Sequence, residues 1–420
     1  MNAYALAVVA ATYAVYALIE RRLGSTPVTA PMLFVAVGLL IGPSGLGLLS
    51  ATGDRHLYTV TFEATLVLVL FTDAMAVNRG PWRSEVALPG RLLGIGLPLT
   101  IVIGWLLAAV MFGALSIWEA AVVGVILAPT DAALGLAVVS NPRVPELVRQ
   151  ALNVESGLND GIVLPILLVF LGLAEHSTDH TMVVAVFFKA IVFATAIGAV
   201  AGWGGAKAVL WLARLGWIGT QWQQIFVVAV AALAYGLATP LRGSGFIAAW
   251  VGGCAMGFGL RDRLPEIRQF PEDLASLFTT ASFLFFGAVY AGPALGGATW
   301  AIAVYALLSL TLARPVPVLI ASTRARLARP TLAYLGWFGP RGLASIVFAD
   351  LIVEHSLPRV TLIRTIVNVT VLASVFIHGA TSRWGSQMYA DWYERRVKVD
   401  PGIPEAGKVR HLAARHRIHR

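Results

Sequence analysis

The chain has 420 residues, of which 58% are apolar and 13% are charged, and its mean hydropathy is +0.77. Soluble domains are about 45–50% apolar and about 25% charged, so this composition excludes a soluble protein and indicates one that faces lipid. The single cysteine, Cys254, excludes a disulfide framework and a cysteine-bound metal. A net charge of +9 would suit a nucleic-acid-binding protein, but the positions of the basic residues exclude that class.

Thirteen segments are long and apolar enough to span a membrane, which takes about 20 residues. In chain order they are 3–20, 30–50, 57–77, 91–114, 118–140, 147–172, 181–213, 221–240, 244–260, 272–291, 298–321, 331–353 and 360–383. The seventh is overlong, which predicts a bend or an interfacial end, and the ninth is short and rich in glycine. The first has no basic region before it and no small-residue cleavage site after it, so we interpret it as a span and not as a signal peptide.

The basic residues are concentrated in every second loop. These loops carry Arg21, Arg22, Arg79, Arg83, Arg91, Arg143, Arg149, Lys207, Arg214, Arg261, Arg263, Arg268, Arg324, Arg326, Arg329 and the tail from Arg383 to Arg420. The other loops carry only Arg55, Arg242 and Arg359. The positive-inside rule therefore predicts a cytoplasmic C-terminus and, with an odd number of spans, an external N-terminus. We interpret residues 1–390 as a membrane domain whose basic loops lie near anionic lipid, and residues 391–420 as a short basic cytoplasmic tail.

Ionisable side chains at membrane depth are costly, so each is a candidate for function. They are Asp73, Asp131, Glu155, Asp160, Lys189, Arg314, Arg341 and Arg364, with Glu63 and Asp350 nearer the span ends. Asp73 fits a solvated helix end as well as a cation-steering group, and Lys189 is expected to reach outward to the interface. The sequence leaves open whether Arg314 and Arg364 pair with core carboxylates or with helix ends. His378 fits a packed histidine better than a pH sensor.

The fifth and twelfth spans each contain a predicted break. Pro129 has no N–H and disfavours helix at Ala128, so the chain unwinds beside Thr130 and Asp131, and unwound carbonyls can line an ion site. A simple kink needs no carboxylate, which favours the ion-site interpretation. The twelfth span is broken by Gly339-Pro340-Arg341-Gly342.

Interrupted helices in corresponding positions of two halves predict an inverted repeat whose site lies where they cross. The carboxylate of Asp131 and the cation of Arg341 would then balance the opposed half-helix ends. Arg341 is alternatively placed to pair with Glu155 and keep it ionised. We favour an organising role for Arg341 over ion contact, because an arginine repels a bound cation.

The sixth span carries a polar face. Glu155 and Asn159 are four residues apart, as are Ser156 and Asp160, so the four side chains form two neighbouring rows on one helix. Their oxygens suit a hard cation, and the absence of soft ligands argues against copper or zinc. Asp160 lies about 13 residues past Leu147, roughly 20 Å into a core of roughly 30 Å. A polar seam that only joins helices would more commonly use hydroxyls and amides.

Together these motifs resemble the monovalent cation:proton antiporter-1 family, the bacterial NhaP-like sodium/proton exchangers. The matching stretches are Pro129-Thr130-Asp131, Glu155-Ser156-x-x-Asn159-Asp160, Gly339-Pro340-Arg341-Gly342 and His378-Gly379-Ala380-Thr381. The resemblance implies a thirteen-helix fold in the inner membrane, a homodimer, and a core bundle that moves against a dimerisation bundle. It does not extend to the long regulatory tail of animal members, so we expect no regulation by such a tail.

The resemblance also implies roles for individual residues. In such proteins Na⁺, and also Li⁺, contacts the residues that match Asp160, Glu155 and Ser156 and the carbonyl of Thr130, with Asp131 nearby. The residues that match Asn159 and Arg341 support the one that matches Glu155. The family usually has a glutamate in the third span where this chain reads Phe71-Thr72-Asp73, so no role is carried over to Asp73.

We expect Asp160 to bind either a cation or a proton, because an empty charged site is too costly to move through the dry barrier. Asn159 cannot carry a second proton, which predicts electroneutral exchange of one cation for one proton by alternating access. No ATP-binding loop or hydrolase motif such as H-E-x-x-H or G-x-S-x-G occurs, so we expect neither an enzyme nor a cofactor. A potassium/proton antiporter of the same fold and a proton-uncoupled cation channel remain alternatives.

Overall fold

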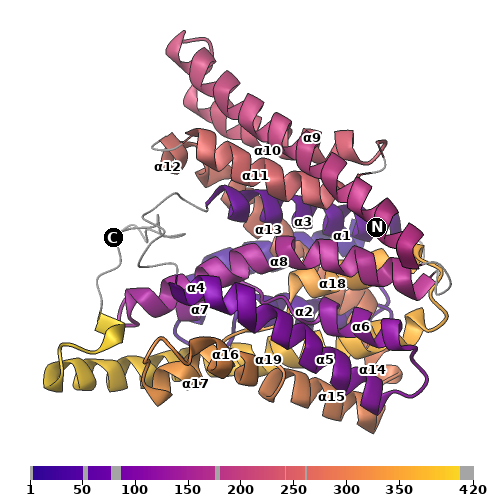
Figure 1. The fold of residues 1–420 in the computed structure, drawn as a ribbon, viewed down its shortest axis with the longest axis vertical. Helices are drawn as coiled ribbons and strands as arrows, with labels where there is room; N and C mark the ends of the chain where they lie inside the picture. Colours follow the sequence, from indigo (N-terminus) through magenta and orange to yellow (C-terminus); the bar gives the residue numbers. More distant parts are fainter. Residues whose placement is uncertain are drawn as a thin grey trace. The chain divides into compact units, whose positions relative to one another are not determined.

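The computed structural model describes residues 3–50, 55–76, 87–175, 180–241, 243–260 and 263–406. These residues form helices joined by turns and loops, with no β-strand among them (Figure 1). The first half contains α1 (Ala3–Leu23), α2 (Ala30–Ile41), α3 (Arg55–Met75), α4 (Ala87–Arg91), η1 (Leu92–Gly96), α5 (Leu97–Met111), α6 (Ile117–Ile126), α7 (Leu136–Val139), α8 (Glu146–Glu175) and α9 (His180–Arg214). The second contains α10 (Thr220–Ala238), α11 (Gly245–Leu260), α12 (Leu264–Ile267), α13 (Gln269–Phe285), η3 (Phe286–Ala291), α14 (Gly292–Gly296), α15 (Trp300–Thr311), α16 (Pro315–Ser322), α17 (Arg329–Trp337), α18 (Leu343–Leu351), η4 (Ile352–Glu354), α19 (Val360–Val399) and η5 (Pro404–Ala406).

The predicted all-α polytopic membrane architecture is confirmed. Within the described ranges, nine helical segments are long and apolar enough to cross a membrane, and α2, α6 and α11 are shorter apolar helices. The count of thirteen spans stays a prediction. Arg79, Arg83, Arg242, Arg261 and the end of the predicted tail, residues 407–420, lie outside the described residues.

The structure corrects two predicted span ends and shows the continuity of two other spans. The second span ends at Ile41 and not at residue 50, because Gly42 is extended and the N–H groups of Leu48 and Leu49 both return to the Ile41 carbonyl at 3.0 Å. The eleventh span agrees with its predicted bounds, as Trp300–Ser322, but contains a turn between Thr311 and Pro315, where proline removes a helical N–H. The seventh span is one continuous helix, α9, of 35 residues. Finally, α19 continues to Val399, past the predicted end at residue 383.

Contacts divide the chain into two compact units, which are described separately. The first contains Met1–Phe62, Ala87–Ser156 and Thr279–Val409. In it the long helix α19 contacts α2, α6, α7, α14, α15, α17 and α18, and α5 packs along α6 (Figure 1). A Cβ on Gly104 would lie 3.3 Å from the Cα of Gly124, so the α5–α6 contact depends on these two small residues.

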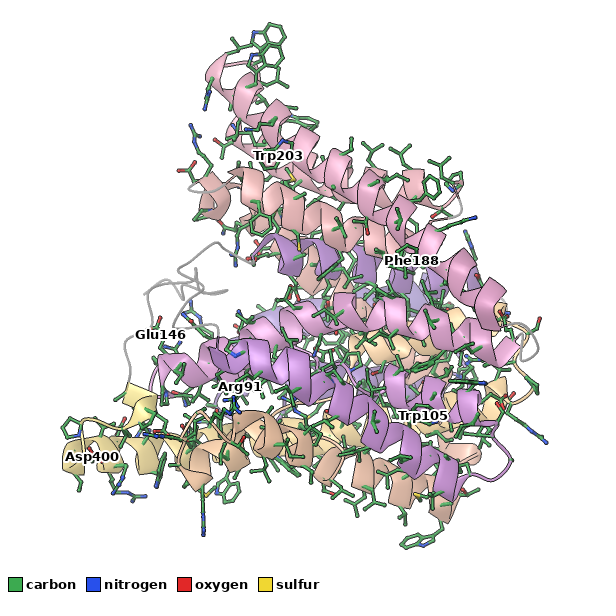
Figure 2. All side chains as sticks on the ribbon, in the orientation of Figure 1. Arg91, Trp105, Glu146, Phe188, Trp203 and Asp400 are labelled. Carbon is green, nitrogen blue, oxygen red and sulfur yellow. The ribbon has the colours of Figure 1, made fainter. Side chains whose placement is uncertain are left out.

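In this unit, labelled charged side chains and a labelled tryptophan lie toward opposite ends of the helices. Figure 2 shows the charged residues Arg91, Glu146 and Asp400 at one end and Trp105 toward the other. Helix α6 begins with a capping box, in which Ser116 and Glu119 satisfy each other's backbone N–H groups. Glu119 also accepts from the backbone N–H of Arg359 at 2.9 Å, which joins the starts of α6 and α19.

The second unit contains Glu63–Val86, Gly157–Phe278 and Arg410–Arg420. Its described part is built on α9, α10 and α11, which pack against one another (Figure 1). Gly198 and Gly202, four residues apart on α9, sit directly on the backbone of Ala248 and Gly252 on α11. A side chain at either glycine would force the helices apart, so this small-residue row sets their spacing.

Candidate functional site

The interruption in the fifth span is confirmed. Helix α6 ends at Ile126, residues 127–135 are non-helical, and the short helix α7 begins at Leu136. The break coincides with Pro129, which cannot donate a backbone hydrogen bond. Carbonyl groups at the end of α6 are thereby left without helical partners.

The interruption in the twelfth span is also confirmed, and it meets the first. Helix α17 ends at Trp337 and α18 begins at Leu343. The backbone N–H of Asp131 donates to the Pro340 carbonyl at 2.8 Å, which ties the two unwound segments together. Both belong to the first unit.

Asp131 caps the helix that begins at this crossing. Its Oδ2 accepts from the Leu343 N–H at 2.6 Å, and its Oδ1 accepts from the Ala133 and Leu134 N–H groups at 2.7 and 3.2 Å. A carboxylate at the start of α18 stabilises the positive end of that helix. A Cβ on Gly342 would collide with the Asp131 side chain, so glycine is required there.

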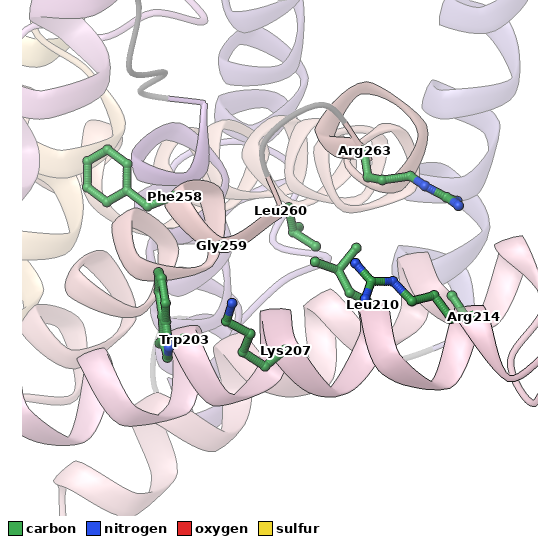
Figure 3. Close-up of a pocket in the computed structure, with 9 residues that line it drawn as sticks. Trp203, Lys207, Leu210, Arg214, Phe258, Gly259, Leu260 and Arg263 are labelled. Atoms are coloured by element: carbon green, nitrogen blue, oxygen red, sulfur yellow. The ribbon is translucent and has the colours of Figure 1, made fainter.

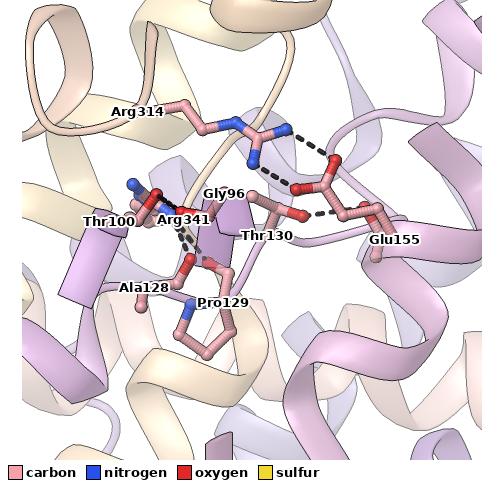
Figure 4. A network of polar contacts seen from close by, with 9 residues as sticks. Gly96, Thr100, Ala128, Pro129, Thr130, Glu155, Arg314 and Arg341 are labelled. Atoms are coloured by element: carbon pink, nitrogen blue, oxygen red, sulfur yellow. Dashed lines mark hydrogen bonds and ion pairs between the residues drawn. The ribbon is translucent and has the colours of Figure 1, made fainter. Parts of the chain in front are cut away.

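Arg341 performs the opposite task at the end of α6. It is fully buried, and its Nη1 donates to the Ala128 carbonyl and, at 3.2 Å, to the Pro129 carbonyl (Figure 4). The Ser345 hydroxyl also donates a hydrogen bond of 2.7 Å to the Ile126 carbonyl. The predicted charge balance between the two broken helices is therefore confirmed.

The alternative in which Arg341 pairs with Glu155 is wrong. Both nitrogen atoms of the Arg314 fork contact Glu155 instead, with Nη2 to Oε2 at 2.7 Å (Figure 4). The two side chains are 3% and 1% exposed, so this is a buried ion pair. Arg314 lies in the loop between α15 and α16, and its guanidinium occupies the space where a Cβ of Gly339 would be.

Helix α8 carries the predicted polar face. The hydroxyl groups of Thr130 and Ser156 are 3.0 Å apart, which connects this helix to the unwound segment after α6. Glu155 and Ser156 belong to the first unit, whereas Asn159 and Asp160, one turn further along the same helix, belong to the second. Asn159 is 1% and Asp160 is 8% exposed.

In the second unit, α8 packs against α3 and α11 through two glycines. A Cβ on Gly157 would lie 3.5 Å from the Asp73 Cβ, and one on Gly161 would overlap the indole of Trp250. Asp73 is 6% exposed, so the interpretation of Asp73 as a solvated helix end is wrong. Gly157 and Asp160 are three residues apart and share a helix face, so the cation-steering alternative for Asp73 stays open.

His378 and Arg364 have structural partners. His378 is buried, with Nε2 3.1 Å from the Trp337 carbonyl and Nδ1 3.2 Å from the hydroxyl of Ser374, which itself accepts from the Arg341 N–H. The packed-histidine interpretation is confirmed. Arg364 lies over the Tyr290 ring, 5.1 Å from its centroid, and not on a core carboxylate that the structure describes.

Fold and crossing thus define a polytopic membrane protein whose two interrupted helices meet through a carboxylate and an arginine. The chain belongs to the family described as "Sodium/hydrogen exchanger, transmembrane", whose sequence profile matches residues 7–385. Its fold is similar to that of the sodium proton antiporter MjNhaP1 from Methanocaldococcus jannaschii, with a TM-score of 0.72, 20% identity, and coverage of 92% of this chain and 97% of that one.

Two curated relatives are similar along most of this chain. The K(+)/H(+) antiporter NhaP of Alkalimonas amylolytica is 26% identical over 389 residues, which cover 92% of this chain and 65% of the relative. The K(+)/H(+) antiporter NhaP2 of Shewanella baltica is 24% identical over 83% of this chain and 60% of its own length. The chain therefore spans less than two thirds of the length of either relative.

Proposed function

We propose that this chain exchanges a monovalent cation for a proton across the bacterial inner membrane by alternating access, without a cofactor. Membership of the exchanger family supports the proposal, as do relatives and a fold neighbour that are themselves named antiporters. The observation that carries it is the polar face of α8, whose Ser156 hydroxyl contacts Thr130 at the helix crossing. Oxygen ligands beside unwound backbone are the usual form of a cation site in such transporters.

In this proposal Asp160 is the carboxylate that exchanges a cation for a proton. The Ser156 hydroxyl and the Thr130 carbonyl supply neutral oxygens, and Glu155 completes the ligand set from a position fixed by Arg314. Neutral oxygens suit an ion that must leave again, because they hold it less strongly than further carboxylates would.

Asp131 is better placed as a positioning residue than as an ion ligand. Its two oxygens accept three backbone hydrogen bonds, so its charge is directed at the start of α18. Arg341 is likewise a positioning residue, held at the end of α6 by carbonyl groups. Asn159 adds no titratable group next to Asp160, which supports an electroneutral exchange of one cation for one proton.

Asp73 extends the proposal beyond the sequence motifs. It is buried against Gly157, on the face of α8 that also carries Asp160. We assign it to the path by which cations reach Asp160. Asp73→Asn is expected to raise the cation concentration for half-maximal exchange more than it lowers the maximal rate, whereas Asp160→Asn abolishes exchange.

Orientation and assembly follow from the loop charges and the family. An external N-terminus and a cytoplasmic C-terminus place the basic loops at the anionic inner leaflet. A homodimer is part of the proposal. Residues 1–390 form the exchange domain and the rest a short cytoplasmic tail, of which residues 391–399 extend α19.

The transported cation is Na⁺, with Li⁺ as a second substrate, in our proposal. A potassium/proton antiporter is the second candidate, because the two curated relatives are named K(+)/H(+) antiporters. Proteoliposomes that contain a pH-sensitive dye separate the two when Na⁺, Li⁺ or K⁺ is added outside. If only K⁺ dequenches the dye, the transported cation is potassium and not sodium. Cation flux without dequenching of the dye would indicate a channel.

The site assignment is tested in the same vesicles with Asp160→Asn. Loss of cation-driven proton movement is expected, because an amide cannot carry the exchanged proton. The matched control is Asp391→Asn, which removes an exposed carboxylate at the cytoplasmic end of α19 and should leave exchange unchanged. Exchange that survives Asp160→Asn would remove Asp160 from the site, and a rate that depends on an imposed membrane potential would exclude electroneutral exchange.

A further inference from the structure

A basic pocket lies in the second unit, between the C-terminal ends of α9 and α11. Its volume is about 450 Å³, which is within the usual range for small-ligand sites. Figure 3 shows Arg214 extending from α9 toward Leu260 and Lys207 extending toward Gly259, with Arg263 just beyond the end of α11 and its side chain directed away from Lys207. The apolar part of the wall consists of Trp203, Leu210, Phe258 and Leu260.

Lys207, Arg214 and Arg263 give the pocket three positive charges, and their mutual repulsion favours an anionic ligand. Lys207 is held above the Trp203 ring, 4.8 Å from its centroid, a contact that orients the ammonium group without neutralising it. In the part of the chain that the structure describes, Arg263 forms an exposed ion pair with Glu266 at 3.5 Å. Exposed pairs of this kind contribute little, so Glu266 competes weakly with a stronger anion.

The length of α9 and the positions of exposed tryptophans indicate how deep the pocket lies in the membrane. The 35 residues of α9 extend about 52 Å at 1.5 Å per residue, whereas the hydrocarbon core is about 30 Å thick, so one end must reach the headgroup layer. Exposed tryptophans surround the C-terminal end and the start of α10: Trp203, Trp211, Trp217 and Trp222. Tryptophan concentrates at the membrane–water interface, which places the pocket at headgroup level.

We propose that this pocket binds the phosphate of an anionic membrane phospholipid, with Lys207, Arg214 and Arg263 around the phosphate. Arginine and lysine donate strong charge-assisted hydrogen bonds to phosphate oxygens. Leu210, Phe258 and Leu260 contact the glycerol and the first acyl carbons. A soluble phosphate would use the cations but not the apolar wall, so the combination favours a lipid.

The test measures lipid binding and not transport. A negative result would therefore overturn the lipid proposal without bearing on the proposed exchange. Purified protein in neutral detergent is titrated with dioleoyl phosphatidylglycerol, with dioleoyl phosphatidylcholine, or with inorganic phosphate. Thermal unfolding and native mass spectrometry report stabilisation and retained lipid. The pocket variant is Lys207→Gln/Arg214→Gln/Arg263→Gln, and Arg214→Gln alone serves if the triple variant does not fold.

The matched control removes three exposed basic-loop cations away from the pocket: Arg21→Gln/Arg22→Gln/Arg324→Gln. Phosphatidylglycerol is expected to stabilise the wild type and the control, and to bind the pocket variant about tenfold more weakly. Equal weakening in the control, or equal binding of phosphatidylcholine, would overturn the proposal. Inorganic phosphate that alone reproduced the full stabilisation would overturn the lipid assignment.

Discussion

The buried ion pair between Arg314 and Glu155 makes the sharpest prediction. Arg314→Gln leaves the Glu155 charge buried without its partner, in a position where the side chain is 1% exposed. An uncompensated charge in the interior is strongly unfavourable, so the variant should be much less stable than the wild type. Exchange activity should fall with it, because Glu155 loses the group that positions it.

The magnitude follows from the geometry. At 2.7 Å between Nη2 and Oε2, the Coulomb attraction is about 6 kcal/mol at an effective dielectric constant of about 20. Desolvation of the two ions opposes that attraction by several kcal/mol each, so the intact pair contributes little net stability. Breaking it by removing one partner is expected to cost about 3–5 kcal/mol, and removing both charges should cost much less.

The assay is a double-mutant cycle in mixed micelles, with unfolding followed by SDS titration. Glu155→Gln/Arg314→Gln is expected to be more stable than Arg314→Gln alone, although it carries one more substitution. Arg324→Gln, which removes an exposed arginine, is the control and should leave stability nearly unchanged. Additive losses in the double variant would mean that the two residues do not interact, which would refute the reasoning.

Three further predictions concern the crossing and the C-terminal end of α19. Asp131→Ala, which leaves three backbone donors without their carboxylate, is expected to cost about 3 kcal/mol in the same SDS titration, with Asp131→Asn losing less. Glu405 accepts from the Ala328 N–H at 2.7 Å at the start of α17, so Glu405→Ala should cost about 1 kcal/mol and make η5 more sensitive to protease. Hydrogen bonds from Arg143 lower the pKa of Glu394, so this contact stabilises the folded chain above the ordinary glutamate range near pH 4.3 and is lost as the pH falls through the lowered value. The difference in melting temperature between wild type and Glu394→Gln should therefore be constant from about pH 8 to about pH 5 and vanish as the pH falls through the lowered pKa of Glu394. A difference that grew on acidification would contradict this sign.

Both interruptions were predictable from sequence because they have local causes. Pro129 and the Gly339-Pro340 pair prevent helical hydrogen bonding wherever they occur, so the chain alone specifies where α6 and α17 must end. The opposite charges of Asp131 and Arg341 then suffice to predict how the broken ends are balanced. The polar face of α8 was predictable for the same reason, since helix spacing is local.

Partner choice among buried charges was not predictable, because it depends on contacts between distant segments. Arg314 and Glu155 are 159 residues apart, and nothing in the sequence ranks Arg314 above Arg341 as the partner. Pro315, which directly follows Arg314, marks a break in an apolar span, but it does not identify the partner of the arginine. The burial of Asp73 likewise arises from the packing of α3 against Gly157, which hydropathy does not report.

The ion pair changes the chemistry that the proposed exchange needs. Because Arg314 neutralises Glu155, the two carboxylates of α8 are no longer equivalent, and protons and cations can compete at Asp160 alone. Asn159 keeps the neighbouring position uncharged in both loaded states. Net charge in the site is then the same with a proton as with a monovalent cation, so both loaded states meet a similar electrostatic barrier, while the empty state carries an extra negative charge and meets a higher one. In the proposed exchange, strict one-for-one coupling therefore depends on Arg314 as much as on Asp160.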